Sequence, residues 1–428
     1  MKPPRHHLLR SNGARQSLVL GAAMITSGAL DYAVNVVAGR RLDPLDFGVF
    51  VSVMAVLQVL TLAAIAIRMV VAFYTASMSV GPSAPARVAR FLRQVEAWAW
   101  RYGAISTTLM ALAAPPLARW LRLPGPSALW AASSMVLLLY VREAAFGGLQ
   151  GVESFLALSV VQVVQAALRL AACAVLIGIG WGAVGAILAQ PLAAAVCVAL
   201  SAAALRPHLG RRGDPGDPGV SWHYSFSTLL ALMAFGMLTN VDALFVRRFF
   251  DVRTAADYAP VVTLAKVALF LSWAIGLVLF PKVARRTAAG EDTRVLLVAG
   301  LAAALSPGLA LSALYLAFPG ALVKVMFTGA YADPGVVLGL ASLAATLYAG
   351  LHIWLNYALS TERKSYAYVL AGVLVWQVAG MWLLGRGDLV HMTLVMVSGG
   401  VIGNVAGAVT TWPRARVAGT SALQLARR

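Results

Sequence analysis

The chain has 428 residues, of which 60% are hydrophobic and 12% are charged, against roughly 25% charged in an ordinary soluble domain. Its 34 Lys and Arg residues outnumber its 16 Asp and Glu residues, giving a formal net charge of +18. A nucleic-acid-binding protein gathers such charge on a soluble face, whereas here the basic residues flank apolar runs. Composition therefore excludes a soluble catalytic domain and a nucleic-acid partner, and predicts an all-α integral membrane protein.

About twelve apolar runs of roughly 20 residues follow one another along the chain. A helix of that length crosses a hydrocarbon core about 30 Å thick. A basic stretch precedes the first run, as in a signal peptide, but no small-residue cleavage site clearly ends it, so we expect a retained helix. The twelve predicted spans are 17–38, 47–67, 97–118, 127–147, 155–178, 181–204, 224–246, 258–280, 294–317, 336–358, 366–385 and 389–411.

The basic residues collect in alternate linkers, with more than twice as many on one side as on the other. The positive-inside rule then predicts that the N- and C-termini are both cytoplasmic. Arg68 lies at the end of a predicted span, where its long side chain is expected to snorkel to the headgroups. Arg142, Glu143 and Glu153 are interpreted as a surface ion cluster at the cytoplasmic ends of the fourth and fifth spans.

The longest mid-chain linker contains the run GDPGDPG at 213–219, which cannot continue a helix. We therefore predict an N-terminal lobe of six spans at 1–205, a cytoplasmic linker at 206–222 and a C-terminal lobe of six spans at 223–428. Each half opens with a span that carries Asn, followed by an Arg pair and then by Asp with an aromatic residue, which indicates a parallel duplication. These residues are Asn35, Arg40-Arg41 and Asp46-Phe47 in one half, and Asn240, Arg247-Arg248 and Asp257-Tyr258 in the other.

Two basic residues, Arg169 and Lys266, lie well inside predicted spans, where charges are costly and usually face a cavity or a partner. Both are roughly 12–14 Å below the outer surface at about 1.5 Å per residue, one in each lobe. Gln162 and Gln165 share a helical face with Arg169. We hypothesise that these residues bind an anionic head group; the alternative is that each base neutralises an acidic neighbour and fixes helix packing.

Further polar residues lie inside the spans. Asp31 and Asn35 share a face of the first span, and Asn240 and Asp242 lie near the outer end of the seventh. Either acid is interpreted as a gate partner for Arg169 or Lys266, or as a packing group, and Asp31 alternatively as a proton or sodium site. His352 titrates near neutral pH when unperturbed, but a lone intramembrane His is commonly a hydrogen-bonded packing group.

Several stretches resemble the polysaccharide transporter (Wzx-like flippase) family of the multidrug/oligosaccharidyl-lipid/polysaccharide exporter superfamily. The stretch 42–48 (LDPLDFG) resembles the start of these transporters, and 240–242 (NVD) with Asp257-Tyr258 resembles the start of their second lobe. Pro281, which closes the eighth span, is similar too. The stretch 325–331 (VMFTGAY) is similar to the family's F-G-x-x-Y pattern, although Thr328 interrupts the Phe-Gly pair.

The resemblance implies two six-helix lobes around a central cavity that alternates access, in a bacterial cytoplasmic (inner) membrane. Family members flip undecaprenyl-diphosphate-linked oligosaccharides to the outer leaflet for surface polysaccharide, such as lipopolysaccharide or exopolysaccharide. The expected partners are this lipid-linked oligosaccharide, membrane lipids and other polysaccharide assembly proteins, and no cofactor or metal is expected.

The alternative function is a multidrug or metabolite exporter of the same superfamily; cationic drugs would favour an acidic cavity. A membrane enzyme is not expected, because the outer loops are short and HExxH, DxD, GxSxG and P-loop patterns are absent. A purely structural membrane subunit stays open as a further alternative.

Overall fold

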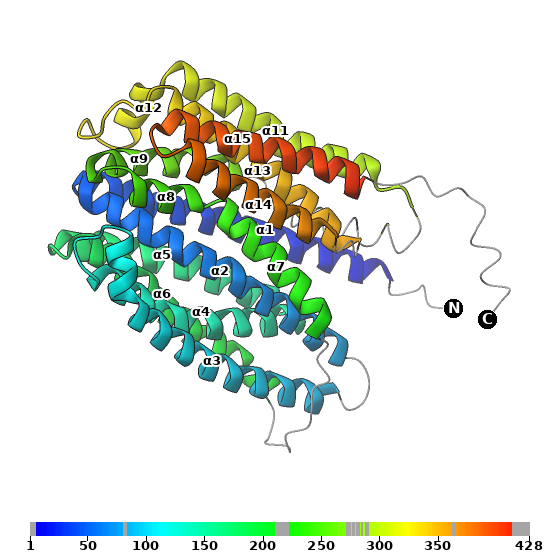
Figure 1. Ribbon diagram of the computed structural model, residues 1–428. Coiled ribbons are helices and arrows are strands. Elements are labelled where there is room, and N and C mark those ends of the chain that lie inside the picture. Colours follow the sequence, from blue (N-terminus) through cyan, green and yellow to red (C-terminus); the bar gives the residue numbers. More distant parts are fainter. Residues whose placement is uncertain are drawn as a thin grey trace, which may run out of the picture.

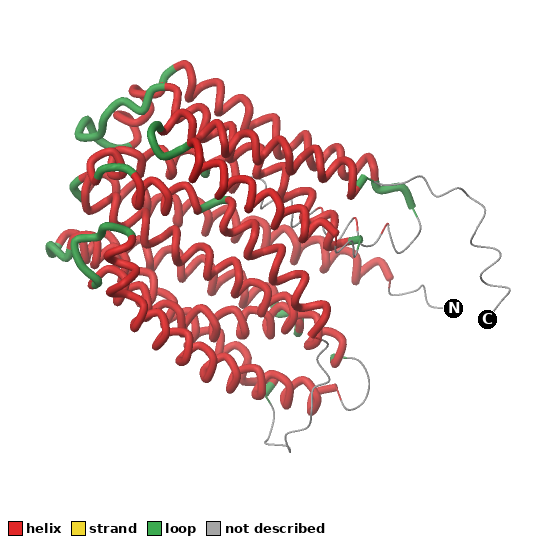
Figure 2. The backbone as a smooth tube through the Cα atoms, in the orientation of Figure 1, coloured by secondary structure: helices red, strands yellow, loops and turns green. Residues whose placement is uncertain are grey.

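A computed structural model gives the fold of the chain (Figure 1) and describes residues 6–79, 84–209, 222–270, 291–361 and 365–412, with 275, 279, 283 and 286 between them. Side chains are described from residue 19 in the first helix and from residue 229 in the first helix of the second half. Pro281 and most of the predicted linker, 210–221, lie outside the described residues. Every regular element in the described ranges is a helix (Figure 2).

The first half contains six long helices. Pro44 at the first turn and the Asp43 side chain, which accepts a hydrogen bond from the Asp46 amide, start the second of them. The bounds are α1 His6–Arg41, α2 Pro44–Met78, α3 Ala84–Trp120, α4 Ser127–Gly151, α5 Phe155–Gly178 and α6 Gly182–Leu205, with a short 3₁₀ helix, η1, at Arg206–His208.

The second half contains the remaining helices. Asp251 and Asp388 each cap the helix that follows them with their side-chain oxygens. The bounds are α7 Trp222–Leu238, α8 Val241–Phe249, α9 Val252–Ala265, α11 Arg294–Ala317, α12 Pro319–Met326, α13 Val336–Ser360, α14 Ser365–Leu384 and α15 Leu389–Thr411.

The packing of the two halves follows one plan. In the first half α1 packs on α5, α2 on α4, α3 on α4, α4 on α6 and α5 on α6. In the second half the helices six spans later repeat these pairs: α7 packs on α14, α9 on α13, α11 on α13, α13 on α15 and α14 on α15. This correspondence is what the predicted parallel duplication requires. The fold is thus two helical lobes joined mainly where α2 packs on α7, α8 and α9.

Nine described helices are long and apolar enough to cross a membrane, and α7 with α8 makes a tenth span if the pair, bent by 46°, counts as one. Eleven predicted spans fall on described helical segments, the seventh of them across the bend between α7 and α8. Of the eighth, 258–280, residues 271–274, 276–278 and 280 lie outside the described residues. Several helices exceed their predicted spans, such as α2, which continues to Met78. The chain is a multi-pass membrane protein whose fold agrees with the predicted class.

The two ends of the bundle differ. At one end, where the connections 41–44, 120–127, 249–252 and 326–336 lie, helices of both lobes converge, and we call this the sealed end. At the opposite end, which contains 78–84, 151–155 and 205–208 and which we call the open end, the helices of the two lobes diverge (Figure 1).

Candidate functional site

A cavity of about 750 Å³ lies between the lobes. It is lined by α1, α2, α4, α5 and α6 of the first lobe, and by α7, α9 and the residues that follow α9 in the second. Residues of both lobes contribute to its polar lining and to its apolar lining. The polar lining residues are Ser27, Asp31, Tyr32, Asn35, Gln58, Thr61, Arg68, Arg142, Glu143, Gln162, Gln165, Arg169, Gln190, Thr239, Asn240, Thr263 and Lys266.

Arg169 reaches the cavity from α5 and forms an ion pair within the first lobe. Its Nη1 donates to Asp31 Oδ1 on α1 over 2.8 Å, and its Nη2 lies 3.7 Å from the sulfur of Met54 on α2. The Arg169 side chain is 12% exposed, whereas that of Asp31 is 43% exposed, so Asp31 remains open to the cavity. Gln162 and Gln165 line the same cavity, as the predicted α5 stripe requires.

Lys266 reaches the cavity from the second lobe at a break in two helices. The regular helix α9 ends at Ala265, and the Lys266 ammonium donates to Asn240 Oδ1 over 2.7 Å. Asn240 itself occupies the bend between α7 and α8, and its side-chain amide donates to the Gly236 carbonyl. Discontinuous helices that meet at a cavity are a recurrent feature of substrate sites in secondary transporters.

Asp242 lies behind this break and does not line the cavity. It is buried in the first turn of α8, where the positive end of the helix dipole favours an acid. Its Oδ2 accepts a hydrogen bond from the Tyr258 hydroxyl on α9 over 3.1 Å. Asn35, in contrast, lines the cavity and donates to the Asp31 carbonyl, one turn earlier on α1.

His352 lies inside the second lobe, away from the cavity lining. It is buried on α13 and packs against the ring of Phe235, with the ring centroids 5.4 Å apart. The side-chain amide of Asn356 lies 3.1 Å from its Nε2. These contacts are those of a packing group, and a gating or coupling role for His352 stays a prediction.

The prediction of a surface ion cluster at Arg142, Glu143 and Glu153 is wrong for the first two residues, whereas Glu153 is exposed as expected. Arg142 and Glu143 are buried, at 8% and 2% exposure, and both line the cavity. The Arg142 guanidinium donates to Glu143 Oε1 through Nε and Nη2, at 3.0 and 2.7 Å. Arg68, expected to snorkel to the headgroups, lies with its Nε 3.5 Å from Glu143 Oε2. Sequence reasoning missed this cluster because a span's hydropathy does not show which of its faces meets a cavity.

The cavity carries an excess of positive charge. Four of its lining side chains are basic (Arg68, Arg142, Arg169 and Lys266) and two are acidic (Asp31 and Glu143). Away from bulk water, an excess charge of this kind selects ligands of opposite sign. The described residues contain no group of His, Cys, Asp and Glu side chains arranged to hold a metal ion.

The sealed end is held by two arginines that occupy corresponding places in the repeat. Arg40, at the end of α1, donates to the Val325 and Met326 carbonyls of the second lobe, at 2.6 and 2.9 Å. Arg247, at the end of α8, donates to the Leu121 and Arg122 carbonyls of the first lobe, both over 3.1 Å. Each lobe thus donates hydrogen bonds to main-chain carbonyls of the other lobe through the arginine that follows its opening span.

Aromatic rings fill the space beside Arg40. The ring of Phe47 lies 5.6 Å from that of Phe327 and 6.0 Å from that of Tyr331, across the lobe boundary. The Tyr331 hydroxyl donates to the Gly39 carbonyl over 2.8 Å, and Phe327 covers Gly39 where a side chain would otherwise stand. The stretches 42–48 and 325–331, which carry the family resemblance, therefore pack against each other.

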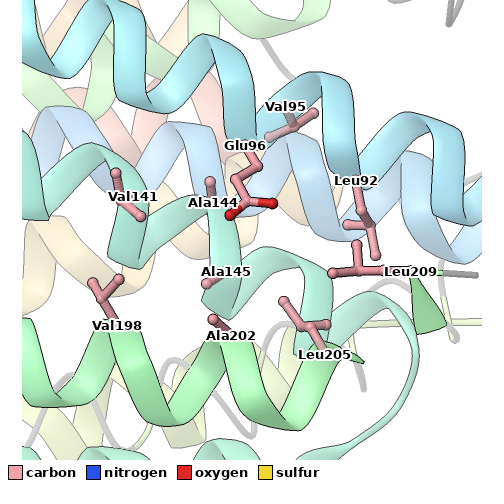
Figure 3. Close-up of a pocket in the computed structure, with 10 residues that line it drawn as sticks. All are labelled: Leu92, Val95, Glu96, Val141, Ala144, Ala145, Val198, Ala202, Leu205 and Leu209. Atoms are coloured by element: carbon pink, nitrogen blue, oxygen red, sulfur yellow. The ribbon is translucent and has the colours of Figure 1, made fainter. Parts of the chain in front are cut away.

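A second, small pocket of about 50 Å³ lies inside the first lobe between α3, α4 and α6 (Figure 3). Its walls are apolar apart from the carboxylate of Glu96, which points towards Ala144. The pocket is too small for more than a water-sized ligand, so the large cavity is the candidate site.

Comparison with known proteins gives structural neighbours only. The sequence matches no protein-family model and no curated protein. An inward-facing multidrug resistance MATE transporter of the MOP superfamily aligns with a TM-score of 0.69 and 13% identity, over 92% of this chain and 97% of that one. The lipid II flippase MurJ, in an inward closed conformation, aligns with a TM-score of 0.68 and 10% identity, over 92% and 87%.

An outward-facing MATE transporter of the MOP superfamily aligns less well, with a TM-score of 0.60 and 13% identity, over 92% of this chain and 94% of that one. The chain therefore has the fold of MOP superfamily transporters. Similarity at this level of identity defines the fold and leaves the substrate to be argued from the site.

Proposed function

We propose that this protein is a flippase that moves a lipid-linked oligosaccharide of the undecaprenyl-diphosphate type across a bacterial cytoplasmic membrane by alternating access, for surface polysaccharide synthesis. Arg169, Lys266, Gln162, Gln165, Asn35 and Asn240 bind the substrate, and Asp31, Asp242 and His352 are assigned to gating or ion coupling. No cofactor takes part. The partners are the lipid-linked glycan, membrane lipids and polysaccharide assembly proteins.

One observation carries this proposal: a single cavity receives Arg169 from one lobe and Lys266 from the other. A diphosphate offers several anionic oxygens, so a planar guanidinium and an ammonium can bind it together. Each base also has a partner in its own lobe, Asp31 for Arg169 and Asn240 for Lys266. Polar side chains around them supply hydrogen bonds for sugar hydroxyls.

The proposed orientation places the N-terminus and the open end in the cytoplasm. The asymmetry of basic residues among the linkers supports this choice. The cavity then faces the leaflet in which the lipid-linked glycan is made, and the sealed end faces the periplasm. The better alignment with the inward-facing than with the outward-facing MATE structure fits this state.

Reconstitution of the purified chain in liposomes tests the proposal. The probe is a polyprenyl diphosphate with a fluorescent label in its head group, and dithionite quenching reports its transfer between leaflets. We expect Arg169→Gln and Lys266→Gln to slow transfer by at least about tenfold, since a charge-assisted hydrogen bond contributes about 1.5–3 kcal/mol. Arg101→Gln is the matched control, because Arg101 is an exposed arginine of α3 outside the cavity lining. Transfer that is no faster than in protein-free liposomes would reject the flippase.

The second candidate is a multidrug or metabolite exporter. The observation in its favour is the Asp31 carboxylate, which is 43% exposed towards the cavity and offers a contact for a cation. This function predicts efflux of a cationic dye that Asp31→Asn abolishes and that Arg169→Gln leaves intact or improves. The flippase predicts no dye efflux above the empty vector.

A further inference from the structure

The cluster of Arg68, Arg142 and Glu143 has one more base than acid. Arg142 is committed to Glu143, since two of its nitrogens donate to Oε1, and its guanidinium lies 5.9 Å from the Phe146 ring centre. Arg68 touches the same carboxylate only through Nε, at 3.5 Å, which is too long for a strong hydrogen bond. Glu143 thus holds Arg142 more closely than Arg68, and the cluster of two bases and one acid carries one net positive charge.

Arg68 is also the accessible member of the cluster. Its side chain is 23% exposed, against 9% for Arg142 and 3% for Glu143, and it lines the cavity. Within the described part of the chain, the two terminal guanidinium nitrogens of Arg68 make no hydrogen bond. A guanidinium carries its donors as a fork that suits phosphate oxygens. The Arg68 guanidinium therefore offers the cavity two charged N–H donor groups that can bind a phosphate.

The position of Arg68 along α2 gives its depth. Met54 contacts Arg169, and Arg68 lies fourteen residues further along the same continuous helix, which is about 21 Å at 1.5 Å per residue. The helix starts at Pro44 at the sealed end, so Arg68 lies about 36 Å from that start. A hydrocarbon core is about 30 Å thick, which puts Arg68 at the headgroup level of the leaflet at the open end.

We propose that Arg68, positioned by Glu143 and Arg142, is a docking site at the mouth of the cavity for the diphosphate of the lipid-linked substrate, occupied before the diphosphate reaches Arg169 and Lys266. This inference rests on the proposed function and extends it. A lipid-linked diphosphate lies at headgroup depth while its tail is in that leaflet, and Arg68 meets it there. Because Arg68 lies about 21 Å along α2 from Met54, which contacts Arg169, one diphosphate occupies the two sites in succession.

Glu143 has a specific part in this arrangement. Its carboxylate lies beside the docking fork, so it repels a second anion and keeps the diphosphate from binding too tightly to leave. Replacing Glu143 by Gln keeps an oxygen for Arg142 and removes the negative charge. If Arg68 is a docking site, Glu143→Gln should bind the anion more tightly. If the ion cluster is purely structural, its loss in Glu143→Gln should weaken anion binding.

The experiment measures binding of undecaprenyl diphosphate to the purified chain in nanodiscs, with undecaprenol as the uncharged control and inorganic pyrophosphate as the lipid-free anion. Arg68→Gln is compared with Arg101→Gln, Arg169→Gln and Glu143→Gln, and the melting temperature of each variant is recorded. We expect Arg68→Gln to weaken undecaprenyl diphosphate binding about tenfold and Glu143→Gln to strengthen it severalfold. Weaker pyrophosphate binding would show that the lipid tail contributes.

Unchanged affinity in Arg68→Gln, together with a loss in Arg169→Gln, would overturn the docking site and leave the proposed function standing. Weaker binding in both Arg68→Gln and Glu143→Gln, accompanied by lower melting temperatures, would assign the cluster to folding alone. A wild-type chain that binds undecaprenyl diphosphate no better than undecaprenol would overturn the proposed function and this site with it.

Discussion

Gly39 offers a sharp test of the seal between the lobes. A Cβ atom built at this position would overlap the Phe327 ring and approach the Phe47 ring to 3.1 Å. Because Phe327 is enclosed by Phe47 and Tyr331, its ring cannot simply rotate away from a new methyl group. The variant Gly39→Ala should therefore push the second lobe away from the end of α1.

The free-energy cost of Gly39→Ala is that of overpacking, which is about 1–3 kcal/mol when a methyl group enters a filled site. This cost applies only to the sealed conformation, so it changes the ratio of sealed to unsealed molecules directly. At about 1.4 kcal/mol per factor of ten, the expected shift is roughly 5-fold to 150-fold towards the unsealed state. The matched control is Gly21→Ala on the same helix, where an added Cβ meets nothing within 4 Å.

The assay is a distance measurement across the sealed end. Leu45 and Val336 are exposed at the starts of α2 and α13, one in each lobe, and accept spin labels as Leu45→Cys and Val336→Cys. The two native cysteines, Cys173 and Cys197, are buried and are replaced by Ala in this background. Pulsed electron resonance should show a longer-distance population in Gly39→Ala. Identical distributions in Gly39→Ala and Gly21→Ala would refute the reasoning.

Three further predictions concern other parts of the structure. Asp31→Asn should release Arg169 from its ion pair, so that undecaprenyl diphosphate binds more tightly while the melting temperature falls; weaker binding would contradict the pairing seen here. Asp251→Ala should cost about 1 kcal/mol by removing the cap of α9, whereas Asp251→Asn should cost less in denaturant titrations. Hydrogen bonds from the first turn of α9 lower the pKa of Asp251, so its contribution is complete above about pH 4 and is lost as pH falls through the lowered pKa; equal acid sensitivity of the wild type and Asp251→Asn would contradict this. Gln377→Leu should destabilise the second lobe by about 1–3 kcal/mol, because the buried Tyr348 hydroxyl loses its 2.6 Å partner, and a melting temperature equal to that of the wild type would argue against this network.

The spans were predictable because each one is a run of about 20 apolar residues that can be recognised from its own sequence, without knowledge of the helices packed against it. The ends of α2 and α3 were not, because a helix that leaves the bilayer continues through polar residues that hydropathy does not register. The breaks at Asn240 and Lys266 were equally hidden. The hydrogen bond that links the two breaks joins residues 26 positions apart, which a local sequence pattern does not reveal.

The candidate site was predictable in part. Arg169 and Lys266 stood out because a charge within an apolar run is costly, and the structure places both at the cavity. Arg142 and Glu143 were misjudged because adjacent opposite charges near a span end look alike whether they face water or a lobe interior. Only the packing of α4 against α2, which brings Arg68 to Glu143, distinguishes the two cases.

The hydrogen bonds that close the sealed end have one property in common: their acceptors are main-chain carbonyls. Arg40, Arg247 and Tyr331 all donate to oxygens that every residue type possesses. A substitution at an acceptor position such as Met326 or Leu121 therefore leaves the bond in place, provided that the backbone keeps its course. The side chains at the acceptor positions can therefore change without loss of these hydrogen bonds. The donor residues, and the small residue Gly39 that Phe327 covers, cannot be replaced as freely. The closure of this chain therefore depends on its donors and on the course of the accepting backbone, and not on which side chains the accepting residues carry.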